Sequence, residues 1–93
     1  MMLGDAEERN TANPTTFEIP SRHERESVRI GNFVKLLFLP DHEQRGERMW
    51  VKVTQRKEGR YVGTLDNHPI VVMSLEHGDT VEFGPEHILD THA

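Results

Sequence analysis

Apolar and polar residues alternate in short segments along most of the chain, and turn-forming residues separate these segments. The longest regular stretch is Glu47–Gln55, in which Met49, Val51 and Val53 fall at every second position. Successive side chains of a strand point to opposite faces, so this stretch predicts a long strand with one buried face. Shorter segments of strand character occupy residues 33–39, 60–65, 70–74 and 80–83.

Turn chemistry between these segments supports the assignment. Lys57-Glu58-Gly59 predicts a tight hairpin in which Gly59 adopts a positive φ. Asp66-Asn67-His68-Pro69 predicts a second turn, because Asn67 tolerates left-handed geometry and Pro69 favours an extended residue before it. The apolar run Ile70–Ser74 then predicts a buried strand, and residues 86–90 a final turn of helix or an edge segment. The fold class is therefore mainly β (α+β): a small antiparallel sheet or partly open barrel of about five strands with one short N-terminal helix.

The N-terminal part of the chain has a different character. Residues 1–16 are polar, so we expect a disordered tail there and a single small β-rich domain over residues 17–93. Ser21 and Glu24 have the spacing of a capping box, which predicts that a short charged helix begins after Ser21 and runs to Arg29.

Composition narrows the classes of protein. The net charge is −5 and there is no cysteine, so disulfides and thiolate chemistry are excluded. Neither a signal peptide nor an apolar run long enough to span a membrane is present, and we expect a cytoplasmic protein. Neither half of the chain is strongly basic, so we expect no nucleic-acid partner.

Five segments combine short apolar strands with turn residues: residues 34–38, 47–51, 63–69, 75–83 and 86–88. Together they resemble the YegJ-like family of uncharacterised bacterial domains. The resemblance covers roughly residues 28–90 and implies a compact α/β or mainly β domain with no established activity.

The strand that contains the single tryptophan is the best lead to a binding site. Alternation along the strand places Trp50 on the other face from Met49 and Val51 and on the same face as Arg48 and Lys52. This second face also needs a cover. We expect residues 17–28 to cover this face, with the aliphatic stems of Arg48 and Lys52 packed around the indole ring. The alternative is a groove for a partner or ligand centred on Trp50, because aromatic residues and arginine are common anchors of interfaces.

Polar residues beside the turns offer a second possibility. Asp66 and Asn67 would normally stabilise their turn through side-chain hydrogen bonds. They could instead line a pocket with His68 or His87 as the proton carrier. The six histidines lack the spacing of a metal site, so we expect no metal and no cofactor.

The sequence thus favours a non-catalytic binding or protein-interaction module with an unknown protein partner or small ligand. One form of it is an acidic inhibitor of a cationic partner such as a toxin. Two alternatives remain open. One is a small His/Asp-dependent or metal-assisted hydrolase; the other is a small barrel that binds single-stranded nucleic acid through Arg56, Lys57 and Arg60 near Tyr61. The candidate binding residues are Arg48, Trp50, Lys52, Tyr61, Asp66, Asn67 and His87.

Overall fold

The computed structural model describes residues 2–40 and 46–93. This part of the chain forms a curled antiparallel sheet, two short helices and one 3-10 turn, which confirms the mainly β class and the partly open barrel. The elements are β1 (Met2–Leu3), α1 (Ala6–Ala12), α2 (Arg22–Glu26), β2 (Phe33–Leu39), β3 (Glu47–Lys57), β4 (Arg60–Leu65), β5 (Thr80–Phe83), η1 (Pro85–His87) and β6 (Ile88–His92).

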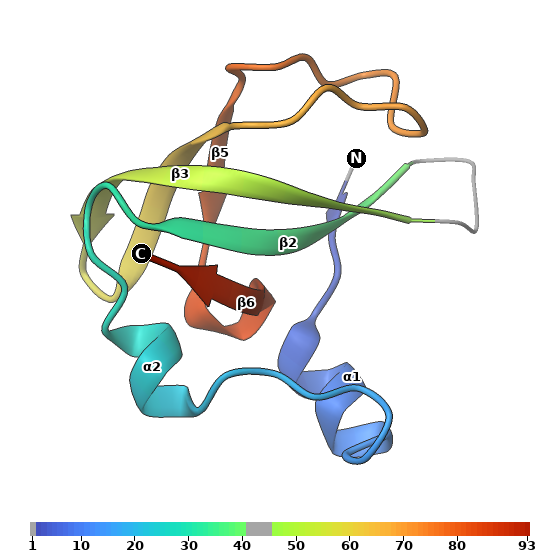
Figure 1. Ribbon diagram of the computed structural model, residues 1–93, viewed down its shortest axis with the longest axis vertical. Coiled ribbons are helices and arrows are strands. Elements are labelled where there is room, and N and C mark those ends of the chain that lie inside the picture. The colour runs from blue at the N-terminus through green and yellow to red at the C-terminus, as the bar shows by residue number, and fades with distance from the viewer. Residues whose placement is uncertain (1, 41–45) are drawn as a thin grey trace.

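Strand β2 lies in the middle of the sheet. It pairs with β3 along one edge and with both β1 and β6 along the other, and β4 and β5 follow beyond β3. Strands β5 and β6 lie toward opposite edges of the sheet, yet only Gly84 and η1 connect them. Such a short connection requires the sheet to curl, as Figure 1 shows.

Two local features assist this curvature. The register between β3 and β4 shifts between Val53 and Gln55, which is the signature of a β-bulge. Opposite it, Gly63 lies so close to β3 that a Cβ atom would stand 2.5 Å from the carbonyl oxygen of Lys52.

A tight turn joins β3 to β4. Lys57 pairs with Arg60, so the hairpin turn has two residues. Glu58 and Gly59 have φ angles of 53° and 78°, which confirms the prediction for Gly59.

The concave side of the sheet encloses the main core. Met49, Val51 and Val53 are buried there, as their alternation predicts. Both helices lie at one end of the molecule in Figure 1, and the connection between β4 and β5 projects at the other end.

The N-terminal segment, for which the sequence predicts a disordered tail, contains a strand and a helix in the structure. Strand β1 pairs with the end of β2, and the Gly4 amide donates to the Leu37 carbonyl. Helix α1 begins after Asp5, whose carboxylate accepts the Glu8 amide, and its Ala6 is fully buried. The polar composition gave no sign of this anchor, because it depends on a strand and on one small residue.

The capping box at Ser21 and Glu24 is confirmed, although α2 ends at Glu26 rather than at Arg29. The composition of residues 40–46 predicts a polar loop, and residues 41–45 of it, which include His42 and Glu43, lie outside the described residues. No helix in the described ranges is long and apolar enough to cross a membrane.

The prediction of a strand over residues 70–74 is wrong. These residues belong to the connection between β4 and β5, which we call the 66–79 loop, and in this run only Val72 is buried. The reason is a side chain from β3. The Glu47 carboxylate accepts the amides of Ile70, Val71 and Val72, so these three N–H groups are not available to a sheet ladder.

Candidate functional site

Trp50 lies on the outer face of the sheet, as strand parity predicts, and is half-buried. The ammonium group of Lys35, directly opposite on β2, stands 4.8 Å from the centre of the indole ring. The His92 ring meets the indole edge-on at 6.3 Å. Lys35 and His92 therefore provide much of the cover for Trp50.

The N-terminal segment covers a different end of the same face. Phe17 and Ile19 pack against a small apolar cluster that contains Leu37 and Leu89. The Arg48 guanidinium stacks on the Phe17 ring at 5.4 Å, while Lys52 is exposed further along β3. The predicted contact of residues 17–28 with this face is present, but its centre is Leu37 rather than Trp50.

We expect replacement of Trp50 by alanine to lower the free energy of unfolding by about 2 kcal/mol, below the range for a fully buried aromatic residue. Lys35→Met is the matched control, since it keeps the stem over the ring and removes only the charge. A urea titration followed by circular dichroism measures both. A Trp50→Ala midpoint equal to that of the parent would contradict the packing role of the indole ring.

Tyr61 lies elsewhere. It is buried in the main core, stacks on Phe83 with ring centres 5.3 Å apart, and donates its hydroxyl to the Arg25 carbonyl at 2.7 Å. Burial raises the pKa of Tyr61. The Arg56 guanidinium lies 5.5 Å from the ring centre. A ring in this position supports the core and offers no free face to a nucleic-acid base.

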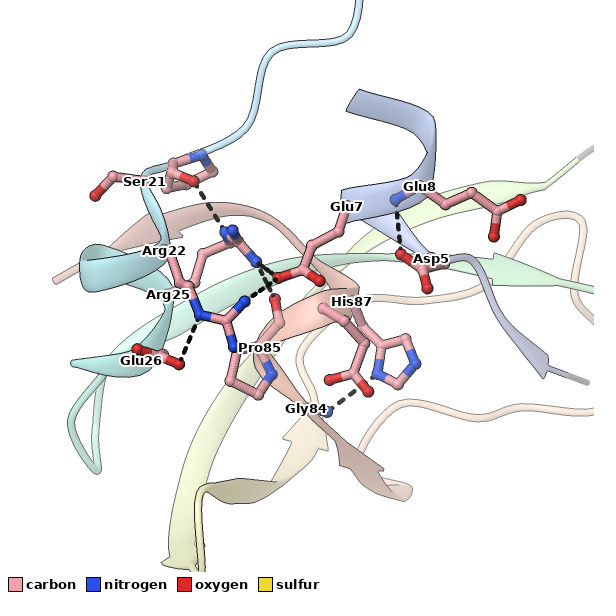
Figure 2. Close-up of polar contacts among 12 residues, drawn as sticks. Asp5, Glu7, Glu8, Ser21, Arg22, Arg25, Glu26, Gly84, Pro85 and His87 are labelled. Carbon is pink, nitrogen blue, oxygen red and sulfur yellow. Dashed lines mark hydrogen bonds and ion pairs between the residues drawn. The ribbon is translucent and has the colours of Figure 1, made fainter. Parts of the chain in front are cut away.

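Arg25 is a buried charged residue that the sequence analysis did not identify. Its Nε donates to the Pro20 carbonyl, and its Nη1 donates both to the Glu7 carboxylate and to the Pro85 carbonyl. Figure 2 shows this guanidinium between α1 and the turn η1. One side chain thus fastens both helices to the connection that closes the half-barrel. No sequence pattern links Arg25 to Glu7 or Pro85, because they lie 18 and 60 positions away in the chain.

His87 is held in one tautomer. Its Nδ1 accepts the Gly84 amide at 3.0 Å, which leaves the ring proton on Nε2. Burial lowers the pKa of His87, although the neighbouring carboxylate of Glu86 opposes this effect. The ring stabilises the turn η1, and its Nε2 is a donor rather than a base. His87 lies apart from the other predicted residues of a polar pocket.

Asp66 and Asn67 begin the 66–79 loop. The Asn67 side-chain oxygen accepts the backbone amide of Trp50, and the Asp66 amide donates to the Trp50 carbonyl at 2.9 Å. These bonds fasten the start of the loop to β3. The structure therefore brings together three of the predicted binding residues, Trp50, Asp66 and Asn67.

Glu47 fastens the middle of the loop. Its Oε1 accepts the amides of Ile70, Val71 and Val72 at 3.1, 2.8 and 3.1 Å, and Oε2 accepts Ile70 at 2.9 Å. Burial acts to raise the pKa of Glu47, but these backbone donors together lower it below its usual range. The carboxylate is consequently ionised at neutral pH and holds three successive residues in one conformation.

The far end of the loop is closed by backbone bonds. The Gly78 amide donates to the Leu65 carbonyl, and the Leu65 amide donates to the Asp79 carbonyl, both at 2.8 Å. The His68 and His77 rings stack with their centres 4.7 Å apart, and His77 Nε2 lies 3.6 Å from Oδ1 of the Asp66 carboxylate. The loop is therefore fixed at its start, middle and end.

Two large apolar side chains project from this fixed loop. Ile70 is 81% exposed and Met73 is 79% exposed, whereas Val72 between them is fully buried. Side chains of this size are more often buried, so these two residues are candidates for a contact with another molecule. The sequence gives no signal for their exposure, because the apolar run 70–74 has the pattern of a buried strand.

The histidine pair with Asp66 is the arrangement closest to a catalytic site. The carboxylate could orient His77 for proton transfer, yet both side chains are about half exposed and the second ring is stacked rather than convergent. Within the described ranges, no group of three His, Cys, Asp or Glu side chains could hold a metal ion.

No curated protein and no solved structure matched the chain. The family model described as an uncharacterised protein conserved in bacteria (DUF2314) matches residues 7–92. The match includes the strands β2 to β6 and the 66–79 loop, and it confirms the expected resemblance at the level of an uncharacterised bacterial domain. The chain therefore belongs to the DUF2314 family of proteins conserved in bacteria.

Proposed function

We propose that this protein is a non-catalytic protein-interaction module and that the 66–79 loop is its contact surface. The observation that carries the proposal is the exposure of Ile70 and Met73, at 81% and 79%, on a loop fixed by bonds from β3. Most connecting loops are polar at their tips, and function concentrates on loops that a rigid scaffold positions.

The fixed shape of the loop favours binding. Ordering a flexible segment on association costs about 0.5–1.5 kcal/mol for each immobilised side chain, so a loop ordered beforehand retains more of its contact energy. The carboxylate of Glu47 and the side chain of Asn67 provide this order in the free protein. Exposed apolar side chains on such a loop act as anchors for a partner's pocket.

The hydrolase alternative has one observation in its favour, the pair of Asp66 and His77 with His68 beside it. The exposure of the pair and the single tautomer of His87 make it the weaker proposal. The nucleic-acid alternative is weaker still, because Tyr61 is buried beneath Arg56.

A cytoplasmic location and a closer relationship to the YegJ-like domains belong to the same proposal. The first is supported by the absence of cysteine, which suits a reducing compartment, and the second by the motif over residues 63–69.

The proposal predicts that the double variant Ile70→Ser/Met73→Ser loses its partner while the fold is kept. Both side chains are exposed, so the free energy of unfolding should change by about 0.5 kcal/mol or less. The immobilised parent and variant are exposed to the same bacterial extract, and the captured proteins are compared by mass spectrometry.

Ile30→Ser is the matched control, because Ile30 is also apolar and 63% exposed but lies before β2. A protein captured by the parent and by Ile30→Ser, and lost with the double variant, is the expected result. Equal capture by all three proteins would show that the loop is not the contact surface.

A further inference from the structure

We infer that the partner of the 66–79 loop presents an apolar surface flanked by positive charge, such as one face of an amphipathic basic helix. This inference rests on the proposed function and specifies the chemistry of the partner. Its two parts are the apolar anchors of the loop and the sign of the charge around them.

The apolar part follows from the way the loop is held. The Glu47 carboxylate binds the amides of residues 70–72 from one side, and Val72 is buried beneath the loop. Ile70 and Met73 flank this fixed point and remain exposed. They consequently form a small exposed apolar surface, which an apolar partner surface can cover.

The charge follows from the sequence of the loop. Residues 66–79 contain the acids Asp66, Glu76 and Asp79 and no lysine or arginine. The Asp79 side chain accepts the Glu76 amide within the loop. Asp66 and Glu76 are exposed, and His77 Nε2 lies 3.6 Å from the Asp66 carboxylate. The whole chain carries a net charge of −5. A field of this sign attracts cationic partners and repels anionic ones.

The same field disfavours two other occupants. A second copy of this chain would bring another net charge of −5 toward the loop, and an anionic membrane surface would repel it in the same way. A protein surface with apolar residues flanked by lysine or arginine satisfies both the apolar anchors and the charge.

Three synthetic helical peptides serve as probes. The first is an amphipathic helix of leucine and lysine; the second replaces each lysine with glutamate; the third replaces each leucine with serine. Each is titrated into the ¹⁵N-labelled full chain, and the amide chemical shifts are followed by NMR. The expected result is a set of shifts confined to residues 68–77 with the leucine–lysine peptide alone.

Two comparisons sharpen the result. The dissociation constant for the leucine–lysine peptide should rise about tenfold between low and high salt, because the attraction is electrostatic and screened. The shifts should disappear in Ile70→Ser/Met73→Ser and persist in Ile30→Ser.

Equal shifts with the leucine–glutamate peptide would overturn the charge preference and leave the interaction proposal standing. Equal shifts with the serine–lysine peptide would overturn the role of the apolar anchors. Shifts outside the loop, or none with any peptide, would overturn the inference as a whole. Failure of the proposed function would appear separately, as equal capture from the extract by the parent and the double variant.

Discussion

Replacing Arg25 with alanine is expected to lower the free energy of unfolding by about 3 kcal/mol. The guanidinium is the shared donor for the carbonyls of Pro20 and Pro85 and for the Glu7 carboxylate, and its side chain is only 7% exposed. Without it, the two part-buried carbonyls lose a donor, and the hydrogen bonds that join the helices to η1 through Arg25 are lost. Urea denaturation followed by circular dichroism measures the change.

Arg22 is the matched control for Arg25. It is on the same helix and also approaches Glu7, at 3.8 Å, but its side chain is 72% exposed. Exposed ion pairs contribute little, so Arg22→Ala should change stability by about 0.5 kcal/mol or less. Arg25→Lys should recover only part of the loss, because a lysine cannot serve three acceptors with the fixed geometry of a guanidinium. Equal losses for Arg22→Ala and Arg25→Ala would show that burial of Arg25 is not what matters.

Replacing Glu47 with alanine is expected to release the 66–79 loop and to lower the free energy of unfolding by about 2 kcal/mol. The carboxylate accepts three successive backbone amides, and no other side chain is known to bind them in the described part of the chain. Amide hydrogen exchange of residues 70–72 should accelerate strongly relative to the strands. Added formate should slow this exchange again, since a small carboxylate can enter the space that the side chain leaves.

Glu76→Gln is the control for the loss of charge, because Glu76 is an exposed acid of the same loop. It should leave the exchange of residues 70–72 unchanged. If Glu47→Ala and Glu76→Gln gave the same exchange pattern, the amide contacts of Glu47 would not determine the conformation of the loop.

The contribution of Glu47 also depends on pH. Its pKa is lower in the folded protein than its usual range, so the folded state favours the ionised form. The stability it provides is therefore fully present above the pKa of the unfolded chain, and it is lost as the pH falls through the lower, folded pKa. The difference in stability between the parent and Glu47→Ala should be constant near neutral pH and should shrink under acidic conditions.

Both expected losses arise from contacts between residues far apart in the chain. Arg25 meets Pro85 and Glu47 meets Val71, and in each case one side chain fastens a segment that lacks regular hydrogen bonding. The two contacts act at opposite ends of the half-barrel in Figure 1. The one at the helices stabilises the fold, and the one at the 66–79 loop shapes the proposed contact surface.

The strands were predictable because their side-chain pattern is a local property. Residues 33–39, 60–65 and 80–83 form strands with the predicted limits, and Gly59 takes the predicted positive φ. The capping box at Ser21 was predictable for the same reason, since both partners lie within one helical turn. Of the candidate site, the sequence identified Trp50, Asp66 and Asn67, but it gave no reason to join them into one arrangement.

The amino-acid sequence by itself determined the fold class, because alternation and turn residues select strands and hairpins before any long-range contact forms. Only the tertiary structure decided where Tyr61, Arg25 and Ile70 lie. The alternation in residues 60–65 could not say whether Tyr61 faces the core or the solvent. The burial of Arg25 required acceptors from α1 and η1, which adjoin it only after folding. Ile70 reads as a strand residue in isolation, and it is exposed because a carboxylate 23 positions away binds its amide. Hydrogen-bond partners at such separations depend on how the sheet curls, and no local pattern of side chains specifies them.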